Sequence, residues 1–66
     1  DGIKLYTKRV DENEFTELAF AMKGIYTDKR AKLTGLNPEA REYYAMYVVN
    51  FKIVGKRSNI IRVIIP

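Results

Sequence analysis

The sequence predicts a small α+β domain with the order β-α-β-β, in which one main helix packs on a three-stranded, mostly antiparallel sheet. Two observations predict this class: apolar residues recur early in the chain with helical spacing, and they alternate with period two elsewhere. A chain of 66 residues is long enough for one small domain over 1–66 and for nothing larger. The chain starts without methionine, which is compatible with excision from a longer protein.

The first strand and the main helix are predicted in the first third of the chain. A strand is predicted over 3–10, where apolar and polar side chains alternate. A helix is predicted over 12–23, because the acidic segment 11–14 has the D-x-x-E spacing of a helix cap. Gly24 is typical of a helix end. The apolar stripe of this helix is Phe15, Leu18, Ala19 and Met22. We expect it to cover the sheet face with Ile3, Leu5, Tyr47, Val49 and Phe51.

The sequence permits two predictions for the middle of the chain. The segment 26–37 is predicted to be a connector, and its basic residues Lys29, Arg30 and Lys32 are interpreted as a solvated turn. One helical turn is expected near 38–42, because Asn37-Pro38 combines a cap residue with a proline at the first helical position. Aromatic and β-branched residues then predict a strand over 43–54. A helix over 38–54 remains the alternative, because the same residues also fit a helical stripe.

A hairpin is predicted at the end of the chain. The loop 55–59 separates the strand 43–54 from a β-branched strand over 60–65. An odd loop matches the apolar pattern, and it pairs Ile53 with Ile61, Phe51 with Val63 and Val49 with Ile65. The same register sets Lys52 opposite Arg62. A right-handed crossover then places the last strand between the other two, covered on both faces.

The composition excludes several classes of chemistry. The chain has no Cys, His or Trp, which excludes disulfides, a thiolate nucleophile, a His general base and every Cys/His metal site. Ser58 is the only serine, and no His is present to activate it. We therefore expect a non-enzymatic protein with no catalytic residue, no metal and no cofactor.

Neither membrane insertion nor export is expected from the sequence. The longest purely apolar run, 43–49, is far shorter than the roughly 18 residues of a membrane span. The first residues have no apolar core of a signal peptide. Together with the absence of Cys, this predicts an intracellular protein, either cytoplasmic or nucleoid-associated.

Basic residues are concentrated after the first quarter of the chain. Residues 1–17 hold three bases and five acids, net −2, whereas 18–66 hold nine bases and three acids, net +6. One face of the predicted sheet carries bases and tyrosines without an acid, and the loop 55–59 adds two bases. Such a surface is typical of proteins that bind single-stranded nucleic acid by stacking and phosphate contacts. The expected binding residues are Lys4, Lys8, Tyr44, Lys52, Lys56, Arg57 and Arg62.

The same predicted face supports an alternative function, interaction with protein. It carries more apolar side chains than a surface exposed to water, and such a patch usually marks an interface. A second copy on this face would give a homodimer and stabilise a marginal core. Docking to a larger protein, as an inhibitor or assembly component, is the other form of this alternative. The expected interface residues are Met46, Val48, Ile60 and Ile64.

Overall fold

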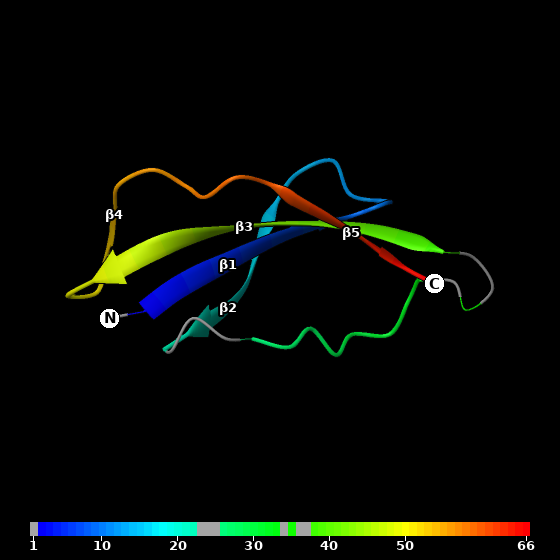
Figure 1. Cartoon of the computed structure of the whole chain (residues 1–66), viewed down its shortest axis with the longest axis horizontal. Coiled ribbons are helices and arrows are strands. Elements are labelled where there is room, and N and C mark those ends of the chain that lie inside the picture. The colour runs from blue at the N-terminus through cyan, green and yellow to red at the C-terminus, as the bar shows by residue number, and fades with distance from the viewer. Residues whose placement is uncertain (1, 23–25, 34, 36–37) are drawn as a thin grey trace.

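The computed structural model describes residues 2–22, 26–33, 35 and 38–66 of the chain. These residues form one antiparallel sheet of five strands and no helix, so the predicted α+β class with one main helix is wrong. Figure 1 shows the strands coloured along the chain, from blue at the N-terminus to red at the C-terminus. Their bounds are β1 Gly2–Arg9, β2 Thr16–Ala21, β3 Glu39–Val49, β4 Lys52–Val54 and β5 Ile61–Ile65.

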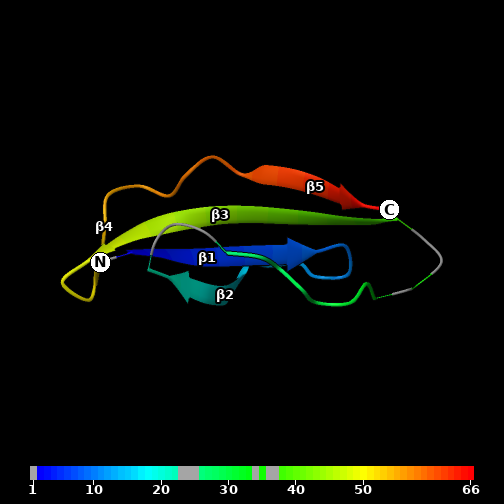
Figure 2. The same cartoon turned by 60° about the horizontal axis from the view of Figure 1, so that its bottom comes forward.

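The long strand β3 organises the sheet. One of its edges pairs with the whole of β1, and β2 lies beyond β1. Its other edge pairs with two short strands in succession, β4 near the end of β3 and β5 near its start. Figure 2 shows the resulting order from β5 through β3 and β1 to β2. The predicted arrangement with the last strand between two parallel strands is therefore wrong.

The segment predicted as the main helix, 12–23, instead contains a turn and β2. The Glu12 amide donates to the Arg9 carbonyl at 3.0 Å, and the Arg9 amide donates to Glu12 Oε1 at 2.7 Å, which closes the turn after β1. Helix caps and turns use the same side chains that accept backbone hydrogen bonds, so the local pattern is ambiguous. β2 pairs with β1, and Leu18 is the extra residue of a β-bulge. The predicted helix end at Gly24 lies outside the described residues.

The segment 38–54 is a strand from near its beginning. β3 starts at Glu39, so the helical turn expected at 38–42 and the alternative helix over 38–54 are both wrong. The predicted strand is confirmed as far as Val49. Asn37, the expected helix cap, lies outside the described residues. Alternating aromatic and β-branched side chains fit the half-buried surface of a sheet, which explains why the strand prediction was right here.

The chain reverses direction at Asn50 and Phe51 and not at the predicted loop 55–59. Asn50 has a φ of 51° and Phe51 a φ of 65°, and the flanking residues pair directly. A two-residue connection with both residues in the left-handed region is a type I′ hairpin. The predicted register with Phe51 opposite Val63 is therefore wrong. The turn has an even number of residues, whereas an odd loop was predicted, and this difference changes which residues share a face. Lys52 therefore lies on the face opposite to the predicted one.

Residues 55–60 run alongside β3 between β4 and β5. Ser58 holds them there, because its amide donates to the Ala45 carbonyl at 2.8 Å and its Oγ accepts from the Ala45 amide at 2.8 Å. The last predicted strand is confirmed as β5, but it lies at the edge of the sheet with most of its side chains exposed. The expectation that it is a central strand covered on both faces is wrong.

The two faces of the sheet have different surroundings. Side chains alternate between the faces of a strand, and Thr7 and Tyr43 lie on the side that the segment 26–33 crosses, here called the covered face. The opposite side is called the open face. Residues of the open face include Lys4, Tyr6, Lys8, Glu42, Tyr44, Arg62 and Ile64.

The apolar core expected between a helix and the sheet is not formed. Phe15 lies against Tyr44 on the open face, with ring centroids 4.9 Å apart. Met22 is 66% exposed, and the Phe51 side chain is fully exposed. The chain measures 42 × 21 × 15 Å, which accommodates one sheet layer and the segment that crosses it. Among the described residues, the buried apolar side chains are Ala21 and Val48.

Candidate functional site

The lysines that β1 places on the open face are paired with acids. Lys4 Nζ lies 3.5 Å from Glu17 Oε1, and Lys8 Nζ lies 3.4 Å from Glu42 Oε1. Glu17 reaches this face from β2, the segment predicted as helix, and Glu42 reaches it from β3. The expectation that this face carries no acid is therefore wrong. Two of the predicted nucleic-acid-binding bases already have carboxylate partners.

Tyr44, the predicted stacking residue, is surrounded by side chains of its own chain. Its ring stacks on Tyr6 with centroids 4.9 Å apart and an interplanar angle of 13°. Phe15 packs against it at a tilt of 59°. The Arg57 guanidinium lies over the ring, 5.2 Å from its centroid. Such aromatic and cation–π contacts stabilise the sheet, so Tyr44 is not a bare platform for a nucleic-acid base.

The other four predicted nucleic-acid-binding residues lie along one edge of the sheet. Residues 50–66, which form β4, the following loop and β5, hold four bases and no acid. Among the described residues, none of these bases lies within ion-pair distance of a carboxylate. We call this set the basic edge. It consists of Lys52, Lys56, Arg57 and Arg62.

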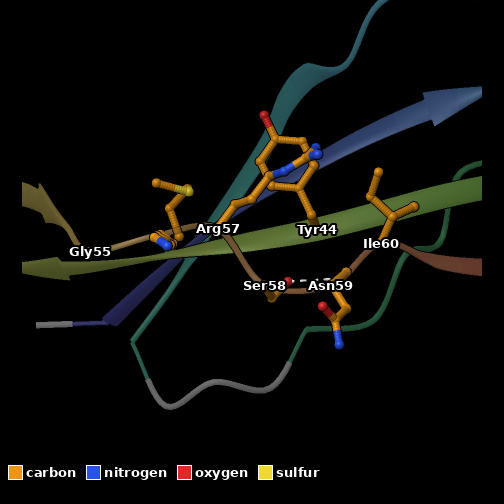
Figure 3. Close-up of a pocket in the computed structure, with 8 residues that line it drawn as sticks. Tyr44, Gly55, Arg57, Ser58, Asn59 and Ile60 are labelled. Carbon is orange, nitrogen blue, oxygen red and sulfur yellow. Dashed lines mark hydrogen bonds between the residues drawn. The ribbon is translucent and has the colours of Figure 1, made fainter.

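An open hollow of about 680 Å³ lies beside the basic edge (Figure 3). The loop from Gly55 to Ile60 forms its wall, and Tyr44 and Met46 contribute from β3. Figure 3 shows the Arg57 side chain lying across the Tyr44 ring. The hollow therefore presents cations and apolar surface together.

The structure brings Met46 and Ile60 together at the hollow but does not gather all four predicted interface residues in one place. Val48 is buried within the chain at 6% exposure, whereas Ile60 and Ile64 are 42% and 55% exposed. Met46 is half-buried and lines the hollow. Ile64 pairs with Ala40, eight positions before Val48 on β3, which at about 3.3 Å per residue is roughly 26 Å. These four residues do not form a single patch.

Exposed apolar side chains are instead concentrated on the last third of the chain. Tyr47 on β3 is 67% exposed, although its strand is central. The type I′ turn, β4 and β5 contribute most of the rest. The exposed apolar residues of these elements are Phe51, Ile53, Val54, Ile61, Val63 and Ile64.

A charged cluster joins the segment before β3 to the covered face. Arg41 is 2% exposed and Glu39 is 3% exposed. Arg41 donates to the Glu39 carboxylate and, at 3.0 Å, to the Arg30 carbonyl, and its Nη1 lies 3.3 Å from Asp28 Oδ2. Arg9 Nε lies 3.1 Å from Glu39 Oε2, and Arg30 Nη2 lies 2.8 Å from Asp28 Oδ2. The cluster thus consists of Arg9, Asp28, Arg30, Glu39 and Arg41.

Hydrogen bonds in the charged cluster favour the ionised carboxylates. The Arg30 side chain holds the pKa of Asp28 well below its usual range, and the Tyr43 hydroxyl also donates to Asp28 at 2.6 Å. The Leu33 amide, 2.7 Å from Oε1, lowers the pKa of Glu39 to about 2. No described buried side-chain polar atom lacks a hydrogen-bond partner. The cluster is therefore satisfied internally and joins the segment 28–33 to the covered face.

Sequence reasoning missed this cluster. The interpretation of Lys29, Arg30 and Lys32 as a solvated turn fits Lys29, which is exposed, but it is wrong for Arg30, which pairs with Asp28. Lys32 Nζ donates to the Pro66 carbonyl at 2.7 Å. The available signal was the alternation of Glu39 and Arg41, which places two charges on one face of a strand. The expected helix start at these residues obscured it.

The described residues offer little for catalysis or metal binding. The Ser58 hydroxyl accepts from the Ala45 amide and donates to the Asn59 carbonyl, so it is engaged by the backbone. In the same part of the chain, no group of three or more Asp and Glu residues is placed to hold a metal ion. A helix of the length and apolarity needed to cross a membrane is also absent from it. Comparisons with protein-family models, curated proteins and solved structures found no match to this chain.

Proposed function

We propose that this chain is a protein-interaction module, an incomplete antiparallel sheet that a protein partner completes. One observation carries the proposal: the described residues bury only Ala21 and Val48 as apolar side chains, while the type I′ turn, β4 and β5 expose theirs. Domains cover the apolar face of a sheet with a second layer. Here the segment 26–33 crosses only part of one face.

The energetics of small domains support the same function. Complete burial of a Val, Ile or Phe side chain stabilises a protein by about 1.5–3 kcal/mol. A chain of this length is marginally stable when its core is small. A partner that covered even a few of the exposed side chains on β4 and β5 would therefore contribute free energy comparable to the whole stability of the isolated chain.

Sedimentation velocity of the pure chain between about 10 μM and 1 mM tests this proposal, with fluorescence of the apolar dye bis-ANS as a second measurement. We expect either association that increases with concentration or strong dye binding by the monomer, because the apolar surface has to be covered. A chain that stays monomeric at about 1 mM and binds no dye would have no such surface. That result would refute the interaction function.

The basic edge favours a second candidate function, binding of single-stranded nucleic acid. Its cations have no carboxylate partner among the described residues, and Lys56 and Arg57 lie together beside the hollow. Phosphates would neutralise them. The logarithm of the binding constant would then fall with the logarithm of salt concentration by about 0.7 per phosphate contact on a single strand. Stacking on Tyr44 is not required, because the basic edge supplies phosphate contacts.

The double variant Lys56→Ala/Arg57→Ala tests this second function. It should reduce the salt slope on a single strand by about 1.4 units, the contribution of two phosphate contacts, without changing base preference. The matched control is Lys4→Ala/Lys8→Ala, which removes the same charge from bases that already pair with acids. Equal effects of both double variants would show a response to net charge alone. Binding weaker than about 1 mM at low salt, for DNA and RNA alike, would exclude this function.

A further inference from the structure

We propose that β5 pairs antiparallel with β5 of a second copy of this chain, so that two sheets become one. The inference rests on the interaction function proposed above and names its partner. β5 pairs with β3 along one edge, and no described residue pairs with its other edge. Figure 2 shows β5 at the margin of the sheet. Its side chains Ile61, Val63 and Ile64 are 61%, 38% and 55% exposed. An open apolar edge of this kind is a template for another strand.

The opposite edge of the sheet is protected against such pairing. β2 carries a β-bulge at Leu18, and bulges disturb the regular ladder that a new strand would need. It also carries Glu17, whose side chain is 51% exposed although it pairs with Lys4. Charges on an edge strand oppose association with another strand. β5 carries one charge, Arg62, but its pairing with β3 has no register shift, so the regular ladder of β5 distinguishes it from the bulged β2.

The sequence of β5 is complementary to itself in one register. A two-fold axis at Val63, the middle residue of the strand, sets Val63 opposite Val63 of the second copy, Ile61 opposite Ile65, and Arg62 opposite Ile64. A register centred on Arg62 would place two guanidinium groups directly opposite each other, which is unfavourable. Pro66 follows the strand and has no amide to extend the ladder. The register centred on Val63 therefore uses all five residues of the strand.

The pairing would also join two grooves, each with one apolar wall. On the covered face, Ile61, Val63 and Ile65 form this wall of a cavity of about 380 Å³, and the rest of its lining is Leu5, Leu18, Tyr26, Asp28, Arg41 and Tyr43. Because Ile61 faces Ile65 of the second copy in this register, the grooves of the two copies meet across the new strand pair. The apolar surface removed from water then includes groove walls as well as the strand itself. The interface is isologous and closes at two copies.

Charge gives this dimer a distinctive salt dependence. Each copy has a net charge of +4, and Arg62 of both copies lies near the axis. Salt screens this repulsion and favours apolar burial, so higher salt should strengthen the dimer. Nucleic-acid binding along the basic edge would show the opposite sign.

Single-cysteine variants test the pairing, because the natural chain has no Cys. In the proposed register Val63→Cys brings two thiols opposite each other, and mild oxidation should give a disulfide-linked dimer about tenfold faster than the control. The matched control is Val10→Cys, at a 69% exposed position in the turn after β1. A second test mixes Val63→Lys with Val63→Glu. Each variant alone should be monomeric, and the mixture should form a heterodimer, because opposite charges then face each other across the axis.

The outcomes separate this inference from the function on which it rests. If the natural chain associates but Val63→Cys cross-links no faster than Val10→Cys, β5 is not the interface and the inference is refuted, while the interaction function remains. If the natural chain is monomeric at about 1 mM yet binds bis-ANS, the second copy is the wrong partner. If it is monomeric and binds no dye, both proposals fail. Selective cross-linking together with heterodimer formation supports the inference.

Discussion

Replacing Arg41 by methionine should destabilise the chain strongly, although the two side chains are similar in size. Arg41 is 2% exposed and contacts three groups on the covered face: the Glu39 carboxylate, the Asp28 carboxylate and the Arg30 carbonyl. The variant Arg41→Met keeps most of the packing volume and removes all three contacts. It therefore isolates the contribution of the charge and its hydrogen bonds.

The expected cost can be worked out from the partners that remain. Removal of one member of a buried ion pair costs about 3–5 kcal/mol when the other charge is left without a partner. Here Glu39 keeps Arg9 at 3.1 Å and the Leu33 amide at 2.7 Å, and Asp28 keeps Arg30 at 2.8 Å. The orphaned group is therefore mainly the Arg30 carbonyl. The free energy of unfolding should then fall by about 2–3 kcal/mol. This loss is near the stabilisation that one charge-assisted hydrogen bond contributes plus the cost of one buried acceptor without a partner.

Urea unfolding followed by far-UV circular dichroism measures this change, and amide hydrogen exchange locates it. We expect faster exchange at the Leu33 amide, because the charged cluster holds the segment before β3 on the sheet. Arg62→Met is the matched control, since Arg62 is exposed and has no ion pair among the described residues. It should change stability by less than about 0.5 kcal/mol. Equal costs for the two variants would show that the cluster does not stabilise the fold.

Three further predictions follow from particular residues. Acid should destabilise the chain, because the folded state lowers the pKa values of Asp28 and Glu39, the latter to about 2. The resulting stabilisation is fully present above their unfolded pKa near 4 and is lost as the pH falls toward 2. An unchanged urea midpoint between pH 6 and pH 3 would contradict this prediction. Val48→Ala should cost about 2 kcal/mol in urea unfolding, whereas Val54→Ala, at 42% exposure, should cost less than about 0.5 kcal/mol; similar costs would show that Val48 is not buried. Phe51→Gly should stabilise the chain by about 0.5–1 kcal/mol, because it relieves a φ of 65° at an exposed side chain and the gain exceeds the entropy cost of glycine. A lower melting temperature for Phe51→Gly would show that its ring is bound in the folded chain.

The strands predicted correctly are those whose signal lies between neighbours in the sequence. The strands 3–10 and 60–65 correspond to β1 and β5, and the predicted strand after 42 corresponds to β3 as far as Val49. Alternation also set which side chains of one strand share a face, and the registers of β1 and β5 with β3 then place Lys4, Lys8, Tyr44 and Arg62 on the open face. The alternation within a strand depends on backbone geometry that repeats every two residues, so no distant contact is needed to establish it.

The helix prediction failed because its local signal has two structural solutions. The acids and the Asn at 11–14 suit a helix cap and a turn equally well. The apolar residues that follow have a spacing compatible both with the period of a helix and with that of a strand. β1 decides between them. Its free edge pairs with β2 over Ile3 to Thr7, and the backbone hydrogen bonds of that ladder replace those that a helix would have formed.

The sequence by itself determined the strand character of β1, of β5 and of β3 from Tyr43 onward, the alternation of their side chains and the excess of basic and apolar residues toward the end of the chain. Only the tertiary structure decided where the chain turns, which strands pair and which charges are buried. Lys52 changed face because the turn closes at Asn50 and Phe51. Arg9 and Glu39 form an ion pair across 30 positions of sequence. Such contacts depend on the free energy of removing both partners from water together, which no local pattern encodes.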